Sequence, residues 1–200
     1  MFKNILAMRN IFIMLSFFLF LLIGAGCDKE WEISPSSRTN IIEKEIDSIG
    51  FKFCLLNESG EASTVFKEGE NFSFFFSVTN RTSRELYFNP EYAYSDKNGF
   101  CTVYTKANMN MGIPYVFKGQ DLAGANGDPL EPNDPLVFKQ LWRDDHDSIW
   151  RWQSGYYEST HQEYLTKGSY FTEFKHSFKF KGEPTIETGE IGFKINFKIQ

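Results

Sequence analysis

The densest group of ionisable side chains in the sequence is the run Asp144-Asp145-His146-Asp147. Carboxylate oxygens and imidazole nitrogens are common ligands of divalent cations in proteins. Asp144, Asp145 and Asp147 are therefore the candidate metal ligands. Their spacing matches no standard metal-binding loop, and an acidic surface turn explains the run equally well. We expect no bound metal and no other cofactor.

Aromatic side chains concentrate in the same part of the sequence. Trp142, Trp150, Trp152 and Tyr156 alternate with polar residues such as Arg143. Large aromatic rings dominate binding hot spots, and exposed rings with polar neighbours are typical of sugar-binding surfaces. The alternative is that the rings are buried, with Trp150 and Trp152 on the inward face of one strand. These four residues are the candidate ligand-binding set.

The sequence contains none of the short motifs that identify common catalytic sites. There is no HExxH, CxxC or GxSxG and no phosphate-binding glycine loop. A carboxylate pair for glycoside hydrolysis cannot be chosen, because the separation of the two groups depends on the fold. We assign no catalytic residue and favour a non-catalytic protein, with an extracellular hydrolase as the alternative.

The first 26 residues have the composition of a secretory signal peptide. Lys3 and Arg9 precede an apolar run, residues 11–23, which is followed by Gly24-Ala25-Gly26. A transmembrane helix needs about 20 apolar residues, more than this run supplies. The segment is predicted to be removed after export.

The segment Ile23-Gly24-Ala25-Gly26-Cys27 resembles the bacterial lipobox, although Gly24 stands where that motif usually has leucine. The resemblance implies that Cys27 is acylated and anchors the chain, and several acyl chains together hold a protein stably in a membrane. Asp28-Lys29-Glu30 resembles the export signal of surface lipoproteins in Bacteroidota. In enterobacteria, Asp after the cysteine indicates retention at the inner membrane. We expect a lipid-anchored cell-envelope protein at the outer membrane, with surface exposure left open.

Composition limits the partners of the exported part. The chain has 21 Lys and Arg against 26 Asp and Glu, and the signal peptide removes two bases and no acid. An acidic chain lacks the basic surface that nucleic acid requires. The expected partners are the membrane, through the lipid anchor, and a glycan or another envelope protein.

Two cysteines remain after Cys27 is committed to lipid. Cys54 and Cys101 both lie in apolar runs that are typical of strands. Export to an oxidising compartment permits a disulfide between them. The alternative is that each is a small buried hydrophobic residue.

Alternation of apolar and polar residues predicts strands from residue 49 to the C-terminus. Residues 27–48 are expected to be a flexible tether containing at most a short helix at 40–47, and residues 119–135 a long loop. Strands are expected at 49–56, 64–67, 72–79, 85–88, 100–105, 113–117, 136–141, 170–180 and 191–199. Short strands without intervening helices favour an all-β, antiparallel sandwich over 49–200, with a closed barrel as the alternative.

Residues 72–88, FSFFFSVTNRTSRELYF, resemble the strand–turn–strand segment of bacterial immunoglobulin-like domains, including the intracellular proteinase inhibitor family. Together with the lipobox and the closing strands, the chain is similar to a set of lipoproteins of gut Bacteroidota. These resemblances imply an immunoglobulin-like β-sandwich and imply no reaction. Proteinase inhibition is a further alternative.

Two short segments, Asp47-Ser48-Ile49 and Asp147-Ser148-Ile149, resemble an O-glycosylation motif of exported Bacteroidota proteins. Taken together, the sequence favours a membrane-tethered, non-catalytic binding or scaffold module of the cell envelope.

Overall fold

A computed structural model describes residues 40–88, 100–117, 127–146, 148–151 and 155–200. They belong to one compact unit, Pro35–Gln200, which is distinct from Met1–Ser34. The chain in these ranges is all β and contains no α-helix. In the same ranges there is accordingly no helix of the length and apolar character needed to cross a membrane.

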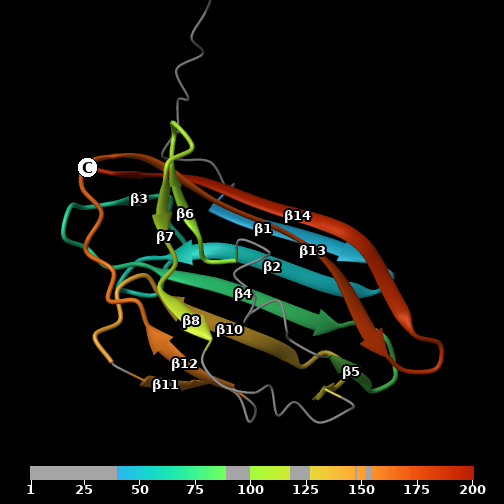
Figure 1. Cartoon of the computed structure of the whole chain (residues 1–200). Helices are drawn as coiled ribbons and strands as arrows, with labels where there is room; N and C mark the ends of the chain where they lie inside the picture. Colours follow the sequence, from blue (N-terminus) through green and yellow to red (C-terminus); the bar gives the residue numbers. More distant parts are fainter. Residues whose placement is uncertain (1–39, 89–99, 118–126, 147, 152–154) are drawn as a thin grey trace, which may run out of the picture. The chain divides into compact units, whose positions relative to one another are not determined.

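Within the described ranges, fourteen strands form three sheets (Figure 1). In chain order the strands are β1 (Ile41–Ile46), β2 (Ile49–Leu56), β3 (Val65–Phe66), β4 (Ser73–Asn80), β5 (Leu86–Phe88), β6 (Val103–Thr105), β7 (Asn110–Gly112), β8 (Tyr115–Phe117), β9 (Asp128–Leu130), β10 (Pro135–Leu141), β11 (Ser148–Arg151), β12 (Gly155–Ser159), β13 (Gly168–Lys181) and β14 (Ile186–Ile199).

The first sheet has the order β1-β2-β4-β10 and the second the order β3-β14-β13-β5-β9, with β6 and β7 added beside β13. The third sheet is β11-β12-β8. All pairs are antiparallel except β3 with β14. The prediction of an all-β, mainly antiparallel domain is therefore confirmed.

Residues 41–48, which the sequence placed in the tether, instead form β1 and the turn into β2. Residues 41–46 pair one by one with residues 49–54 of β2, and Ile42 and Ile46, on the same face of the strand, pack against the core. Asp47 and Ser48 both have positive φ, 51° and 62°. Two such residues form the turn type that suits a two-residue hairpin. The expected short helix at 40–47 is wrong.

Aromatic rings join the first two sheets through a shared core. In β13 and β14 buried residues alternate with more exposed ones, whereas β2 and β4 are buried along most of their length. Rings from opposite sheets contact each other, as in Phe53–Phe174 at 5.1 Å, Phe76–Phe193 at 5.5 Å and Phe72–Phe197 at 5.2 Å between centroids. Such pairs add about 0.5–1.5 kcal/mol each beyond the burial of their area.

The predicted C-terminal hairpin is confirmed as β13 and β14, which pair in register from Gly168–Ile199 to Phe180–Ile186 with one bulge near Ser177. Other parts of the prediction need correction. The expected loop at 119–135 contains β9 and the start of β10. β12 lies where no strand was predicted, and β11 overlaps the strand that was considered only as an alternative for Trp150 and Trp152.

Cys54 and Cys101 are both buried thiols, and no disulfide joins them. Cys54 pairs in register with Ile41 and Phe75 on the outer face of the first sheet, whereas Cys101 belongs to the core. Successive side chains of a strand point to opposite faces, so the face that carries Phe53 and the core excludes Cys54. The possible bridge is therefore not formed.

Candidate functional site

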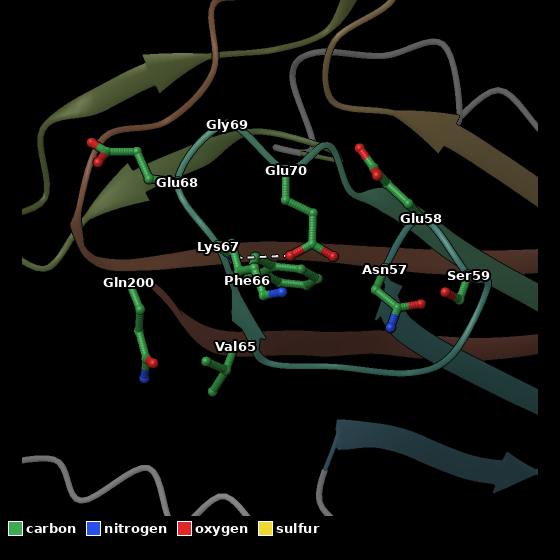
Figure 2. Close-up of a pocket in the computed structure, with 10 residues that line it drawn as sticks. All are labelled: Asn57, Glu58, Ser59, Val65, Phe66, Lys67, Glu68, Gly69, Glu70 and Gln200. Atoms are coloured by element: carbon green, nitrogen blue, oxygen red, sulfur yellow. Dashed lines mark hydrogen bonds between the residues drawn. The ribbon is translucent and has the colours of Figure 1, made fainter.

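A polar pocket of about 670 Å³ lies between the turns that flank β3 (Figure 2). It is lined by the β2–β3 turn, by β3 and the turn that follows it, and by Gln200. The turn after β3 is fixed locally, because Glu70 accepts a hydrogen bond from the Lys67 amide at 2.8 Å and Gly69 has a φ of 81°. Glycine tolerates this left-handed conformation at little cost.

The carboxylates of this pocket are tied to the backbone around it. Glu58 Oε1 accepts a hydrogen bond from the Asn71 amide at 3.0 Å, and Glu68 Oε1 accepts one from the Lys167 amide at 3.3 Å. A carboxylate bonded through one oxygen can still accept hydrogen bonds from a ligand. The pocket therefore suits a ligand with hydroxyl or amine donors.

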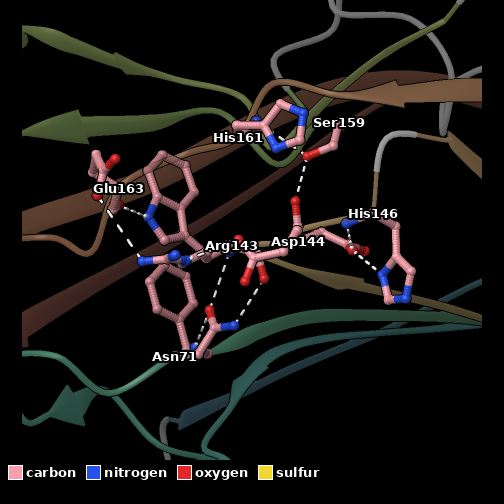
Figure 3. A network of polar contacts seen from close by, with 10 residues as sticks. Asn71, Arg143, Asp144, His146, Ser159, His161 and Glu163 are labelled. Atoms are coloured by element: carbon pink, nitrogen blue, oxygen red, sulfur yellow. Dashed lines mark hydrogen bonds and ion pairs between the residues drawn. The ribbon is translucent and has the colours of Figure 1, made fainter.

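Asn71 connects the pocket to the loop that follows β10 (Figure 3). Its side-chain amide donates to the Arg143 carbonyl at 2.8 Å, and its Oδ1 accepts from the Arg143 amide at 3.1 Å. These two bonds form a cyclic pair between side chain and backbone. They hold the backbone of Arg143 against Asn71, whose own backbone amide donates to the pocket residue Glu58.

The Arg143 side chain lies against an exposed ring. Its guanidinium carbon is 4.6 Å from the centroid of Tyr164, and the Tyr164 residue is 41% exposed. Arg143 Nε also donates to Asp145 Oδ1 at 3.1 Å, and this bond raises the pKa of the guanidinium. Arg143 is thus a permanent cation stacked on an aromatic face, an arrangement common in recognition sites. We call the pocket together with Arg143 and Tyr164 the turn-end surface.

Trp142, a predicted ligand-binding residue, is instead part of the core and is 1% exposed. Its indole stacks on Phe72, and its Nε1 donates to the Glu163 carbonyl at 2.9 Å. The ring has no face available to a ligand. Its assignment to the binding set is wrong because a strand end buries it.

The predicted acidic metal ligands have other partners in the described part of the chain. Asp144 is buried, and its Oδ1 lies 2.6 Å from His146 Nδ1. Asp145 is bonded to Arg143, as described above, and Asp147 lies outside the described residues. Among the described residues no group of three or more acidic, histidine or cysteine side chains is placed to hold a metal ion.

Ser159 and His161 extend the contacts of Asp144 without forming a catalytic triad (Figure 3). Ser159 Oγ donates to the Asp144 carbonyl at 2.5 Å and accepts from the His161 amide at 3.1 Å. The hydroxyl thus joins the end of β12 to the loop that follows β10. The buried Asp144 carboxylate does orient the exposed imidazole of His146, which is the relationship between a general base and its positioning group.

A pair of carboxylates, Glu85 and Glu131, lies beside β5 and β9. The hydrogen bond from Tyr87 lowers the pKa of Glu85, as does the bond with Glu131. The same bond to Glu85, together with its negative charge, raises the pKa of Glu131. Direct contact is closer than the roughly 5–9.5 Å that separates the two carboxyl groups in glycoside hydrolases. This pair does not have the spacing for that reaction.

The remaining predicted residues are only partly placed. Trp150 and Tyr156 are opposite each other in the β11–β12 pair, but the description there covers the backbone alone. Trp152 and Cys27 lie outside the described residues. Tyr164 was not among the predicted residues. Its only indication in the sequence was its place in a polar segment just before β13, of the kind that is usually exposed.

Ser48, in one of the two predicted glycosylation motifs, is exposed at the tip of the β1–β2 turn. Ser148 begins β11, and the Asp147 before it lies outside the described residues. Glycosylation of the two serines stays a prediction.

Comparisons with protein-family models, with curated proteins and with solved structures found no match to this chain.

Proposed function

We propose that this protein is a non-catalytic binding module of the bacterial cell envelope, exported and tethered to the outer membrane through acylated Cys27. Its ligand is a glycan or another envelope protein, bound at the turn-end surface. The lipobox resemblance supports the anchor, and the acidic composition is consistent with a partner other than nucleic acid.

The domain is proposed to be an immunoglobulin-like β-sandwich. The ring contacts between β2 or β4 and β13 or β14 support a two-layer arrangement, because they join strands that belong to two separate sheets. In such folds the loops at one end of the layers carry the ligand contacts while the sheets supply a rigid support. The turn-end surface is built from loops of this kind.

One observation carries the assignment of the site: Arg143 is stacked on the exposed ring of Tyr164, and its backbone is bonded to Asn71, which is bonded in turn to the pocket residue Glu58. An exposed tyrosine and arginine held in one geometry lose little conformational entropy on binding. The neighbouring carboxylates accept hydrogen bonds from hydroxyl or amine groups. A hydroxyl-rich glycan or a polar protein segment meets both requirements.

The test is binding of the full chain to isolated envelope glycans and to detergent-solubilised envelope proteins. Tyr164→Ala should weaken binding at least about tenfold, in line with the loss of a hot-spot aromatic residue. Val137→Ala, which truncates a side chain of similar exposure on the outer face of β10, is the matched control and should bind as the parent does. Equal binding by the two variants would remove the turn-end surface from consideration.

The second candidate function is a hydrolase, and the contact between His146 and Asp144 supports it. Nδ1 faces the buried carboxylate, so Nε2 is left to accept a proton from water or a substrate hydroxyl. The assay measures hydrolysis of chromogenic ester and glycoside substrates by the parent and by His146→Ala. Activity in the parent that disappears in the variant would establish this alternative. No activity above the buffer rate would eliminate it for those substrates.

A further inference from the structure

Strand β14 has one edge that is largely unpaired within the described part of the chain. Its other edge pairs with β13 along the whole strand. On the unpaired side, β3 covers only Lys198 and Ile199. From Ile186 to Asn196 the strand therefore presents backbone groups that no neighbouring strand of the described sheets uses. Such an edge is a template for pairing with another chain.

The hydrogen bonds at the end of β14 identify the backbone groups on this edge. The Lys198 amide donates to the Thr64 carbonyl on the β3 side. Backbone groups of a strand alternate between its two edges with a period of two residues. The amides and carbonyls of Glu190, Gly192 and Lys194 consequently face the same edge as those of Lys198.

One lysine from the other sheet lies at this edge. Lys44 of β1 donates from Nζ to the Gly192 carbonyl at 2.8 Å, and its ammonium lies 5.3 Å from the centroid of Phe193. Lysine at a strand edge discourages indiscriminate pairing. The contact covers a single carbonyl and is exposed, so a specific partner strand can displace it. It also confirms that the Gly192 carbonyl points out of the sheet.

Charges along the edge are arranged symmetrically about Gly192. Glu190 precedes it by two residues and Lys194 follows it by two, and both side chains lie on the face opposite the buried Ile191 and Phe193. If two β14 strands pair antiparallel with a twofold axis at Gly192, each Glu190 is opposite a Lys194. Opposite charges in directly facing positions stabilise a strand pair, and like charges destabilise it.

Other registers of the same self-pairing are less favourable. Moving the axis two residues toward the C-terminus places the two Lys194 side chains opposite each other. Moving it two residues toward the N-terminus places the two Glu190 side chains opposite each other. Moving the axis by one residue, to Phe193 or Ile191, keeps the faces but sets Glu190 opposite Asn196 or Lys194 opposite Thr188, so the opposite charges no longer face each other. The charges therefore select the axis at Gly192.

We propose that the open edge of β14 binds the same edge of a second copy of this chain, antiparallel about Gly192, so that the two β14-containing sheets become continuous. A symmetric interface of this kind is the commonest arrangement in homodimers. The pairing surface is distinct from the turn-end surface. It stands whether or not that surface binds a ligand.

Disulfide cross-linking of the full chain in membranes tests the register directly. In the proposed pairing the two Gly192 Cα atoms are about 5.5 Å apart, within the range for a disulfide. Gly192→Cys should therefore give a cross-linked dimer under mild oxidation. Asn196→Cys is the matched control on the same edge, because its twofold mate lies eight residues along the partner strand, roughly 27 Å away.

A dimer band with Gly192→Cys that is absent from the parent and from Asn196→Cys supports the proposal. Bands of equal strength in the two variants, or none in either, would overturn it. A thermal melt shows whether Gly192→Cys folds. The double variant Glu190→Cys with Lys194→Cys gives a second route to the same cross-link if it does not.

Charge substitution provides an independent check by sedimentation. Glu190→Lys places two lysines opposite two lysines and, by removing both charge pairs, should weaken dimerisation about tenfold. Adding Lys194→Glu restores opposite charges across the axis and should recover the dimer. Lys194 also pairs with Glu173 within its own chain at 2.9 Å, so unfolding is measured alongside. Dimerisation that is unchanged by Glu190→Lys, with or without Lys194→Glu, would contradict the register.

Discussion

The indole of Trp142 lies parallel to the ring of Phe72, with 5.9 Å between the centroids and 6° between the planes. Trp142 follows the last residue of β10, and Phe72 immediately precedes β4, so the stack closes the end of the first sheet. The indole amide also donates to the Glu163 carbonyl. This relationship joins the core to the segment that carries Tyr164.

Trp142→Ala should destabilise the domain by about 3–5 kcal/mol, because it removes a buried ring and leaves a cavity. Trp142→Phe should cost less, since it keeps most of the packing but leaves the Glu163 carbonyl without its donor. Urea unfolding measures both. Tyr164→Ala is the control and should change the free energy of unfolding by less than about 1 kcal/mol, because its ring is partly exposed. A Trp142→Ala variant as stable as the parent would refute the core assignment.

The Asp47–Ser48 turn should be stabilised by glycine. Ser48 has a φ of 62°, a conformation that costs an L-residue about 1 kcal/mol relative to glycine. Ser48→Gly should therefore raise the free energy of unfolding by up to about 1 kcal/mol. The matched change Ser59→Gly, at an exposed turn residue without positive φ, serves as the control. A loss of stability in Ser48→Gly greater than in Ser59→Gly would contradict the turn geometry.

The contact between Glu85 and Glu131 predicts a pH-dependent effect. The bond to Glu85 and its charge raise the pKa of Glu131, so its stabilising proton is present at low pH and is lost as the pH rises through the raised pKa. The pKa of Glu85 shifts in the opposite direction: it is lowered, chiefly by the hydrogen bond from Tyr87. Deprotonation of Glu131 therefore brings two negative charges into contact, and they repel each other.

Glu131→Gln should therefore raise the melting temperature at neutral pH and have little effect at a pH below the usual range of glutamate. Glu183→Gln makes the same chemical change at an exposed residue of the β13–β14 turn and should have little effect at either pH. Melting curves at the two pH values decide the matter. A change in melting temperature on Glu131→Gln that is the same at both pH values would show that protonation of Glu131 does not affect stability.

The two buried cysteines should be unreactive in the folded protein. Burial raises the pKa of Cys54, which reduces the fraction present as the reactive thiolate. Alkylation at neutral pH should modify Cys54 and Cys101 only after unfolding, with peptide mapping to separate them from Cys27. Recovery of a peptide pair linked through Cys54 and Cys101 would show that a disulfide does form.

Strands with strict alternation could be predicted from the sequence, because one face of each is buried and the other is charged. In β14, for example, Phe193 and Ile195 are in the core while Lys194 between them is exposed. β1 was missed because its outward Glu43 and Glu45 made it resemble a linker. β12 was missed because its residues do not alternate cleanly between apolar and polar.

The candidate site was less predictable, since it depends on contacts between distant segments. A tryptophan at a strand end has the same composition signal whether it is buried, as Trp142 is, or exposed. Tyr164 is a candidate because Asn71, distant in the sequence, holds the backbone of Arg143, whose guanidinium lies over the tyrosine ring. Residue type suggested the aromatic region, but register and burial decided which ring is available.

Hydrogen exchange of the full chain, measured with and without the envelope glycan or envelope protein that binds it, tests the proposed function most directly. Binding at the turn-end surface should slow exchange in residues 57–60, 66–71, 142–146 and 160–167, and this protection should be lost in Tyr164→Ala. The β1–β2 turn, outside this surface, should exchange at its original rate. Protection confined to other segments, despite a bound ligand, would contradict the account.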